Sequence, residues 1–174
     1  NEWPPAETNY RTLFFQESHR LGIEPPATKE AFDHYVGDYS CGTGESSRYN
    51  RLYAQNVDNY YSDWHDRDKR MLCYTTDVFE KNIEVTGHHY VTEGVFRALH
   101  RRIAEGHTNI PNIGPSHSFL ERDARYMTPG ECSEITFDLL PTSWLFKAGH
   151  RLRIAIALAD SDHFSRIPDG VIPT

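Results

Sequence analysis

The segment from Asp160 to Arg166 holds the densest group of chemically active side chains in this sequence. It combines two carboxylates, an imidazole, a phenyl ring and a guanidinium, contributed by Asp160, Asp162, His163, Phe164 and Arg166. Such a mixture of charge and aromatic surface is typical of a loop that is half-buried against a partner. We therefore take these five residues as candidates for a contact with another domain or for the wall of a cleft. The alternative is that the segment is simply solvated.

Metal ligation is the second chemistry that these residue types allow. The sequence has ten histidines, including the adjacent pair His88-His89 and the more widely spaced His100, His107 and His117. Adjacent residues on a strand point to opposite faces, and no H-E-x-x-H pair is present. Asp160-Ser161-Asp162 offers carboxylates to calcium but lacks the glycine-marked acidic loop of an EF-hand. We predict no metal site and no cofactor.

Nucleophilic catalysis by a serine is the third chemistry that the sequence could support. An exposed catalytic serine on a strand-to-helix turn needs the pattern G-x-S-x-G. The nearest string, Gly114-Pro115-Ser116-His117-Ser118, fails at its last position, and its proline restricts the turn. The sequence therefore predicts no catalytic residue within this chain.

Aromatic residues suggest a different class of function. Tyr60, Tyr61 and Trp64 lie in the polar, tyrosine-rich stretch Tyr49–Asp68, which we predict to be a long surface loop. Aromatic rings on such a loop stack on sugars in carbohydrate-binding modules. The competing interpretation is that they pack the loop onto the rest of the domain or onto a neighbouring one.

The elements that must position these residues are short strands. In Glu134–Leu139 every second residue is apolar, so that Ile135, Phe137 and Leu139 share one face. The same period returns in Leu152–Leu158, and the small Ala155 and Ala157 predict that its second face is also partly covered. Further strands are expected at Arg11–Gln16, Arg70–Thr76 and Ile83–Val85, with a break at Leu21–Pro26 and an extended segment at Phe32–Tyr39. Many short strands indicate an all-β sandwich.

One stretch has two interpretations. Val95, Phe96, Leu99 and Ile103 follow the spacing of an amphipathic helix, whereas the preceding Tyr90-Val91-Thr92 favours a strand running into it. In a strand, Gly94 would mark a bulge or a close approach of another backbone.

Composition limits the classes of partner. The 174 residues suit a single domain over 1–174, and the net charge of −7 argues against a nucleic-acid footprint, despite the short basic group His100-Arg101-Arg102. No run of apolar residues is long enough to predict a membrane span. Cys41, Cys73 and Cys132 are expected to be buried or half-buried thiols in a reducing compartment, which favours a cytoplasmic location. A single disulfide and a homo-oligomer stay open.

Four motifs in order resemble the C-terminal domain of the CocE/NonD hydrolases. They are Arg70-Met71-Leu72-Cys73-Tyr74-Thr75-Thr76, Ile83-Glu84-Val85-Thr86-Gly87-His88, Val91-Thr92-Glu93-Gly94-Val95-Phe96-Arg97-Ala98 and Phe146-Lys147-Ala148-Gly149-His150-Arg151-Leu152-Arg153-Ile154. That family includes cocaine-esterase-like acyl esterases, α-amino-acid ester hydrolases, glutaryl acylases and, more distantly, X-prolyl dipeptidyl peptidases. The resemblance extends over nearly the whole chain.

The resemblance implies a jelly-roll-like, galactose-binding-domain-like β-sandwich with long loops, joined to an α/β-hydrolase domain of the same polypeptide. The Ser-His-Asp triad of that domain would lie upstream, so this chain alone would be inactive. It would support the catalytic domain and its substrate cleft, with the Asp160–Arg166 segment near the cleft. Acyl esters, amino-acid esters, β-lactams and Xaa-Pro peptides all stay open as substrates.

The chain departs from the family pattern at one internal position. Gly87-His88-His89-Tyr90-Val91 joins two motifs directly where family members carry a strand, an acidic loop and another strand. A sandwich without an inner strand would leave backbone groups unpaired in its core. We therefore expect a segment of the domain to be missing between residues 88 and 90, and expect further strands beyond Thr174.

Overall fold

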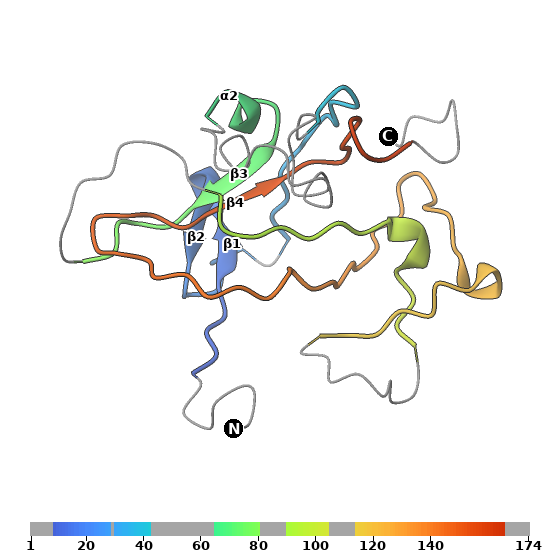
Figure 1. The fold of residues 1–174 in the computed structure, drawn as a ribbon, viewed down its shortest axis with the longest axis horizontal. Helices are drawn as coiled ribbons and strands as arrows, with labels where there is room; N and C mark the ends of the chain where they lie inside the picture. The colour runs from blue at the N-terminus through green and yellow to red at the C-terminus, as the bar shows by residue number, and fades with distance from the viewer. Residues whose placement is uncertain (1–8, 29, 43–64, 81–89, 105–113, 166–174) are drawn as a thin grey trace, which may run out of the picture. The chain divides into compact units, whose positions relative to one another are not determined.

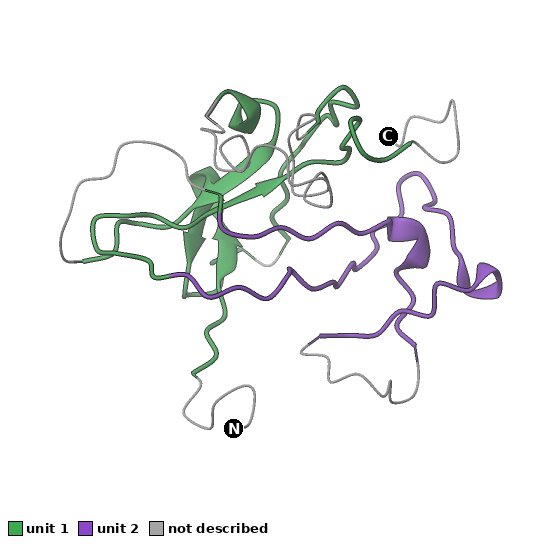
Figure 2. Cartoon of the chain, viewed as in Figure 1, with its two compact units in different colours: residues 1–90, 145–166 green, residues 91–144, 167–174 purple. Residues whose placement is uncertain are grey.

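The computed structural model describes residues 9–28, 30–42, 65–80, 90–104 and 114–165. The chain divides into two compact units. Unit 1 is formed by Asn1–Tyr90 and Leu145–Arg166, and unit 2 by Val91–Trp144 and Ile167–Thr174. Figure 2 shows which segments make up each unit. Each unit has its own internal organisation.

Unit 1 contains a four-stranded sheet whose order follows the sequence (Figure 1). Its strands are β1 (Phe14–Gln16), β2 (Arg20–Gly22), β3 (Leu72–Thr75) and β4 (Arg153–Ile156). β1 and β2 are antiparallel, β2 and β3 parallel, and β3 and β4 antiparallel. In the described part of the chain the only α-helix is the single turn α2 (His65–Asp68). The all-β fold class is confirmed at this level.

The β3–β4 pair is the longest ladder of the sheet, with Leu72 opposite Ile156 and Thr75 opposite Arg153. Thr76 extends it beyond β3: its N–H donates to the Leu152 carbonyl at 2.9 Å, and its hydroxyl accepts the Leu152 N–H at 3.0 Å. The pairing then continues to Phe79, whose N–H donates to His150 and whose carbonyl accepts from Gly149. Two of the sequence motifs therefore lie side by side, although about 75 residues separate them.

The small core of unit 1 lies on one face of this sheet. Leu21 of β2 and Tyr74 of β3 are each 4% exposed, and the Phe15 ring lies 4.3 Å from the Tyr74 ring. The Tyr74 hydroxyl donates to the carboxylate of Asp33. Burial, followed by this hydrogen bond, raises the pKa of Tyr74 to about 12. Tyr74 is therefore a protonated donor throughout the physiological range.

A tight turn joins β1 to β2. The Arg20 N–H donates to the Glu17 carbonyl, and Ser18 and His19 both have positive φ, at 57° and 56°. Two successive left-handed residues match the type I′ geometry that suits the twist of a hairpin. The predicted break at Leu21–Pro26 is wrong at its first two positions, because this turn brings Leu21 and Gly22 back beside β1.

Several other predicted elements differ from the structure. α2 occupies the end of the predicted loop Tyr49–Asp68, and the segment predicted to be extended, Phe32–Tyr39, joins no strand. The second face of β4 is open, since Ala155 and Ala157 are exposed. Ile83–Val85 and the 88–90 junction lie outside the described residues.

The predicted buried strand Glu134–Leu139 is also wrong as a strand. This segment lies beside the region of Glu93. The Leu140 N–H donates one backbone hydrogen bond to the Glu93 carbonyl, and no continuous ladder forms between the described residues of the two segments. The apolar residues of this segment are uncovered: Ile135 is 39%, Phe137 43% and Leu139 51% exposed. An alternating apolar row is buried only where a second layer covers it.

Unit 2 is organised around the ring of Phe96. This ring stacks on Phe137 at 5.6 Å with an interplanar angle of 6°, lies 4.5 Å from His117, and contacts Phe119 edge-on at 6.5 Å. Close to it, an added Cβ on Gly94 would meet the Asp138 carbonyl oxygen at 2.6 Å. Of the two alternatives for Gly94, a bulge or a close backbone approach, the structure shows the close approach, although no strand runs through this residue. The helix predicted by the spacing of Val95–Ile103 is limited to the 3₁₀ turn η3 (Ala98–His100). An isolated antiparallel bridge between Ile103 and His117 follows it.

The turn that precedes β4 gives the first prediction. Gly149 has φ 79°, and its N–H donates to the Phe79 carbonyl at 2.6 Å. The turn conformation predicted for Gly149 is confirmed. Gly149→Val should lower the free energy of unfolding by about 1–3 kcal/mol, because a β-branched residue is strained in this region of φ. Urea unfolding measures the change.

Lys147→Val in the same turn is the matched control, because Lys147 is exposed and is not among the residues with positive φ. It should unfold as the wild type does. An unchanged melting temperature for Gly149→Val would show that the turn tolerates a side chain.

Candidate functional site

The loop that follows β4 is folded onto its own unit. The Asp160 carbonyl accepts the N–H groups of His163, at 3.3 Å, and Phe164, at 2.9 Å, which closes a tight turn. The Ser161 N–H donates to the Cys41 carbonyl at 2.9 Å. Asp160, His163 and Phe164 are half-buried, whereas Asp162 is exposed. The structure thus brings four of the five predicted loop residues together, and Arg166 lies outside the described residues.

The other wall of this site is the turn Asp38–Gly42. The Cys41 N–H donates to the Asp38 carbonyl at 3.0 Å, and the Asp162 carboxylate occupies the space that a side chain on Gly42 would need. A side chain at position 42 would therefore have to displace the Asp162 carboxylate. We call the pair of segments 38–42 and 160–164 the loop site.

Charge holds the 38–42 turn in shape. The Arg70 Nε donates to Asp38 Oδ2 at 2.7 Å, and the Ser40 N–H and hydroxyl donate to Asp38 Oδ1 at 2.9 and 2.6 Å. The Arg70 hydrogen bond, with those of Ser40 after it, lowers the pKa of Asp38 to about 2. Tyr35 donates from its hydroxyl to the Arg70 carbonyl at 2.8 Å. Arg70 thus connects the start of β3 to the loop site.

Two of the three cysteines lie in surroundings that disfavour the reactive thiolate form. Cys41 is buried and Cys73 half-buried, and burial raises the pKa of both thiols. All three cysteines are free. The expected burial is confirmed for Cys41 and Cys73 and is wrong for Cys132, which is exposed.

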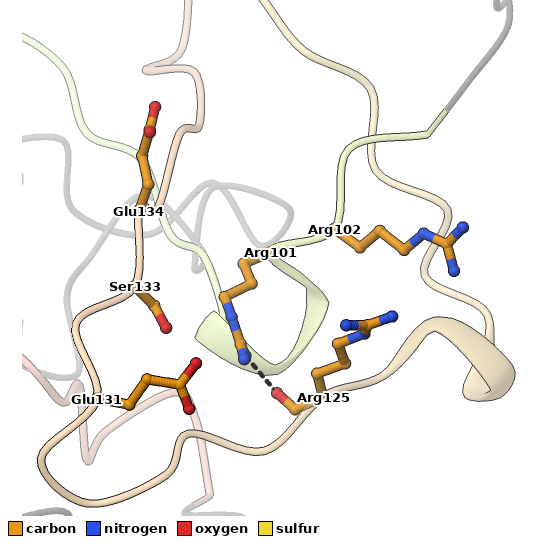
Figure 3. Close-up of a pocket in the computed structure, with 6 residues that line it drawn as sticks. All are labelled: Arg101, Arg102, Arg125, Glu131, Ser133 and Glu134. Atoms are coloured by element: carbon orange, nitrogen blue, oxygen red, sulfur yellow. Dashed lines mark hydrogen bonds between the residues drawn. The ribbon is translucent and has the colours of Figure 1, made fainter.

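Unit 2 contributes an open hollow of about 460 Å³ that the sequence did not predict. Figure 3 shows its lining residues, Arg101, Arg102, Arg125, Glu131, Ser133 and Glu134. The Arg101 guanidinium donates to the carbonyls of Ala98, Arg125 and Tyr126, and Arg102 pairs with Asp123 at 2.6 Å. These contacts hold η3 to the neighbouring segment, so two of the three arginines serve the fold.

The two described histidines of unit 2 that were considered as ligands each lie in aromatic surroundings. His117 belongs to the Phe96 cluster, where its two ring nitrogens face the carbonyls of Arg102 at 3.2 Å and Thr136 at 2.9 Å. His100 lies against Phe119. Among the described residues, no three His, Cys, Asp or Glu side chains are grouped to hold a metal ion. Tyr60, Tyr61 and Trp64 lie outside the part of the chain that the structure describes, as do His88, His89 and His107.

Comparison with known proteins decides the family. Residues 89–174 match the model of the X-Pro dipeptidyl-peptidase C-terminal non-catalytic domain. This part of the chain belongs to that family. The match includes the Phe96 cluster, β4 and the 160–164 half of the loop site, and it confirms the resemblance drawn from the four motifs.

Two curated relatives extend the comparison to the whole chain. They are proteins named "putative serine esterase" from Mycobacterium bovis and Mycobacterium tuberculosis, and each is 35% identical over 201 residues that cover 99% of this chain. The chain spans only 32% of the length of these relatives. No solved structure matches the chain. In the described residues, the structure has no helix with the length and apolar character needed to span a membrane.

The loop site leads to a prediction on acid stability. The pKa of Asp38 is lowered from 3.8 to about 2, so its contribution is complete above pH 4 and is lost as the pH falls through about 2. Asp38→Asn should remove that acid-sensitive part of the unfolding free energy. Urea unfolding at several pH values between 2 and 5 measures it.

Asp77→Asn removes the same charge from an exposed pair with Arg20, away from the loop site, and is the matched control. It should keep the wild-type slope of stability against pH. An Asp38→Asn profile parallel to that of the wild type would show that the Arg70 pair does not stabilise the folded chain.

Proposed function

We propose that this chain is the accessory part of a serine hydrolase, and that it supports the catalytic domain and walls part of the substrate cleft. The observation that carries the proposal is the pattern of coverage: relatives named as serine esterases align with 99% of this chain, but the alignment covers only 32% of their own length. The family that residues 89–174 belong to is itself non-catalytic. The absence of a G-x-S-x-G string from the sequence agrees with that role.

The parent enzyme would cleave an ester or amide through an acyl-enzyme. An activated serine of the catalytic domain would attack the carbonyl carbon, and water would then release the acid. The names of the relatives favour an ester, either an acyl ester or an amino-acid ester, ahead of β-lactams and Xaa-Pro peptides. The comparisons do not favour the carbohydrate-binding alternative.

A jelly-roll-like β-sandwich is the complete domain that we propose. The exposed apolar row Ile135, Phe137 and Leu139 supports it, because such a row is normally covered by a second layer. The alignment with the relatives is longer than this chain, so they carry residues within it that this chain lacks. We place part of that difference at the 88–90 junction, where the family match begins. Sequencing the gene across the codons of His88 and Tyr90 tests this placement.

The first test concerns chemistry. The isolated chain should resist a fluorophosphonate probe and should not hydrolyse p-nitrophenyl esters, because it has no activated serine. The full-length protein should be labelled once, on a serine outside this chain. Mass spectrometry locates the label, and stoichiometric labelling of Ser116 or another serine of this chain would overturn the non-catalytic assignment.

The second test concerns the loop site as a wall of the cleft. In the full-length enzyme, Phe164→Ala and Arg166→Ala should lower kcat/KM by about threefold to tenfold, because contacts at a cleft or interface are lost. Tyr10→Ala, which truncates an exposed aromatic of unit 1 outside the loop site, should leave the kinetics unchanged. Wild-type kinetics in both loop variants would mean that the loop faces water.

A further inference from the structure

Phe119 is held in an exposed position by a strained backbone. Its φ is 52°, a value that bulky residues rarely adopt, and its side chain is 62% exposed. A left-handed backbone conformation is unfavourable for any residue with a Cβ, so holding Phe119 in it lowers the stability of the turn. Phe119 contacts the rings of Phe96, His100 and His117, yet more than half of its side chain stays outside that packing.

The turn around Phe119 is built by specific contacts. The Ser118 hydroxyl donates to Asp123 Oδ2 at 2.7 Å, and the second oxygen of Asp123 accepts from Arg102 at 2.6 Å. The Ser118 hydrogen bond lowers the pKa of Asp123, so the carboxylate stays ionised and the turn stays closed near neutral pH. These contacts therefore fix the backbone that carries the Phe119 ring.

Exposed apolar side chains flank Phe119 in the sequence and across the isolated bridge. Ile103 is 53% exposed and pairs with His117 at the isolated bridge, while Leu120 is exposed beside Phe119. The rings of Phe96, His100 and His117 contact Phe119. Arg102 and Asp123 add an ion pair to the same turn. An aromatic anchor with aliphatic neighbours and a charged rim is the usual composition of a binding hot spot.

We infer that the surface formed by Ile103, Phe119 and Leu120 docks an apolar patch of the catalytic domain of the same polypeptide. The occupant is indicated by the coverage of the relatives, since about two thirds of their length lies outside the region that matches this chain. A tether to that remainder makes docking intramolecular, so a small apolar patch is enough to hold the two parts together. This inference rests on the proposed function and adds a second contact, separate from the loop site.

The test uses full-length protein that is folded first and then cut at a protease site introduced between the catalytic domain and this chain. Dilution followed by size-exclusion chromatography gives the Kd of the two parts. Phe119→Gly should raise that Kd at least tenfold, even though glycine relieves the strain at φ 52°. Phe119→Ala should raise it similarly. Phe32→Ala truncates an exposed ring of unit 1 and should leave the Kd unchanged.

The outcomes separate this inference from the proposed function. An unchanged Kd in both Phe119 variants, with tight wild-type association, overturns the docking surface and leaves the accessory role intact. Wild-type parts that separate on cutting overturn both. Self-association of the cut chain that Phe119→Gly abolishes would assign the surface to a second copy and overturn the inference.

Discussion

Antiparallel pairing between β3 and β4 is the constraint on which unit 1 depends. It joins two segments that lie about 75 residues apart and fixes their register through Thr76, whose backbone and hydroxyl both bond to Leu152. The positive φ of Gly149 allows the chain to turn back at the correct point to enter that pairing. Because closing so long a loop costs conformational entropy, the ladder and the core on Tyr74 must together offset it.

The loop site is a consequence of the same pairing. β4 delivers Asp160–Phe164 to the turn Asp38–Gly42, and Arg70, just before β3, holds that turn by its ion pair with Asp38. Both ends of the site are thus positioned by the two strands of one ladder. Because the ion pair is partly exposed, it contributes little to the stability of the fold, and its main effect is to fix the shape of the turn.

Unit 2 has a different organisation, in which the described side chains pack around one aromatic ring and not on a sheet. Phe96 collects Phe137, His117 and Phe119, while Arg101 and Arg102 tie η3 to the segment around Arg125. The surrounding apolar side chains remain largely exposed. Exposed apolar surface of this extent is typical of a part of a protein that another layer or partner covers.

The sequence by itself determined the local elements and the family. Alternation in Arg70–Thr76 and Leu152–Leu158 predicted β3 and β4, glycine chemistry predicted the turn at Gly149 and a bulge or close approach at Gly94, and four short motifs predicted the hydrolase accessory domain. These features depend on interactions between near neighbours or on the conformational freedom of one residue. The tertiary structure alone decided that Ile135, Phe137 and Leu139 are uncovered, that Leu21 and Gly22 form a strand, and that Phe119 is held outward. Burial and partner choice depend on which distant segments meet, and hydrophobic periodicity carries no information on that.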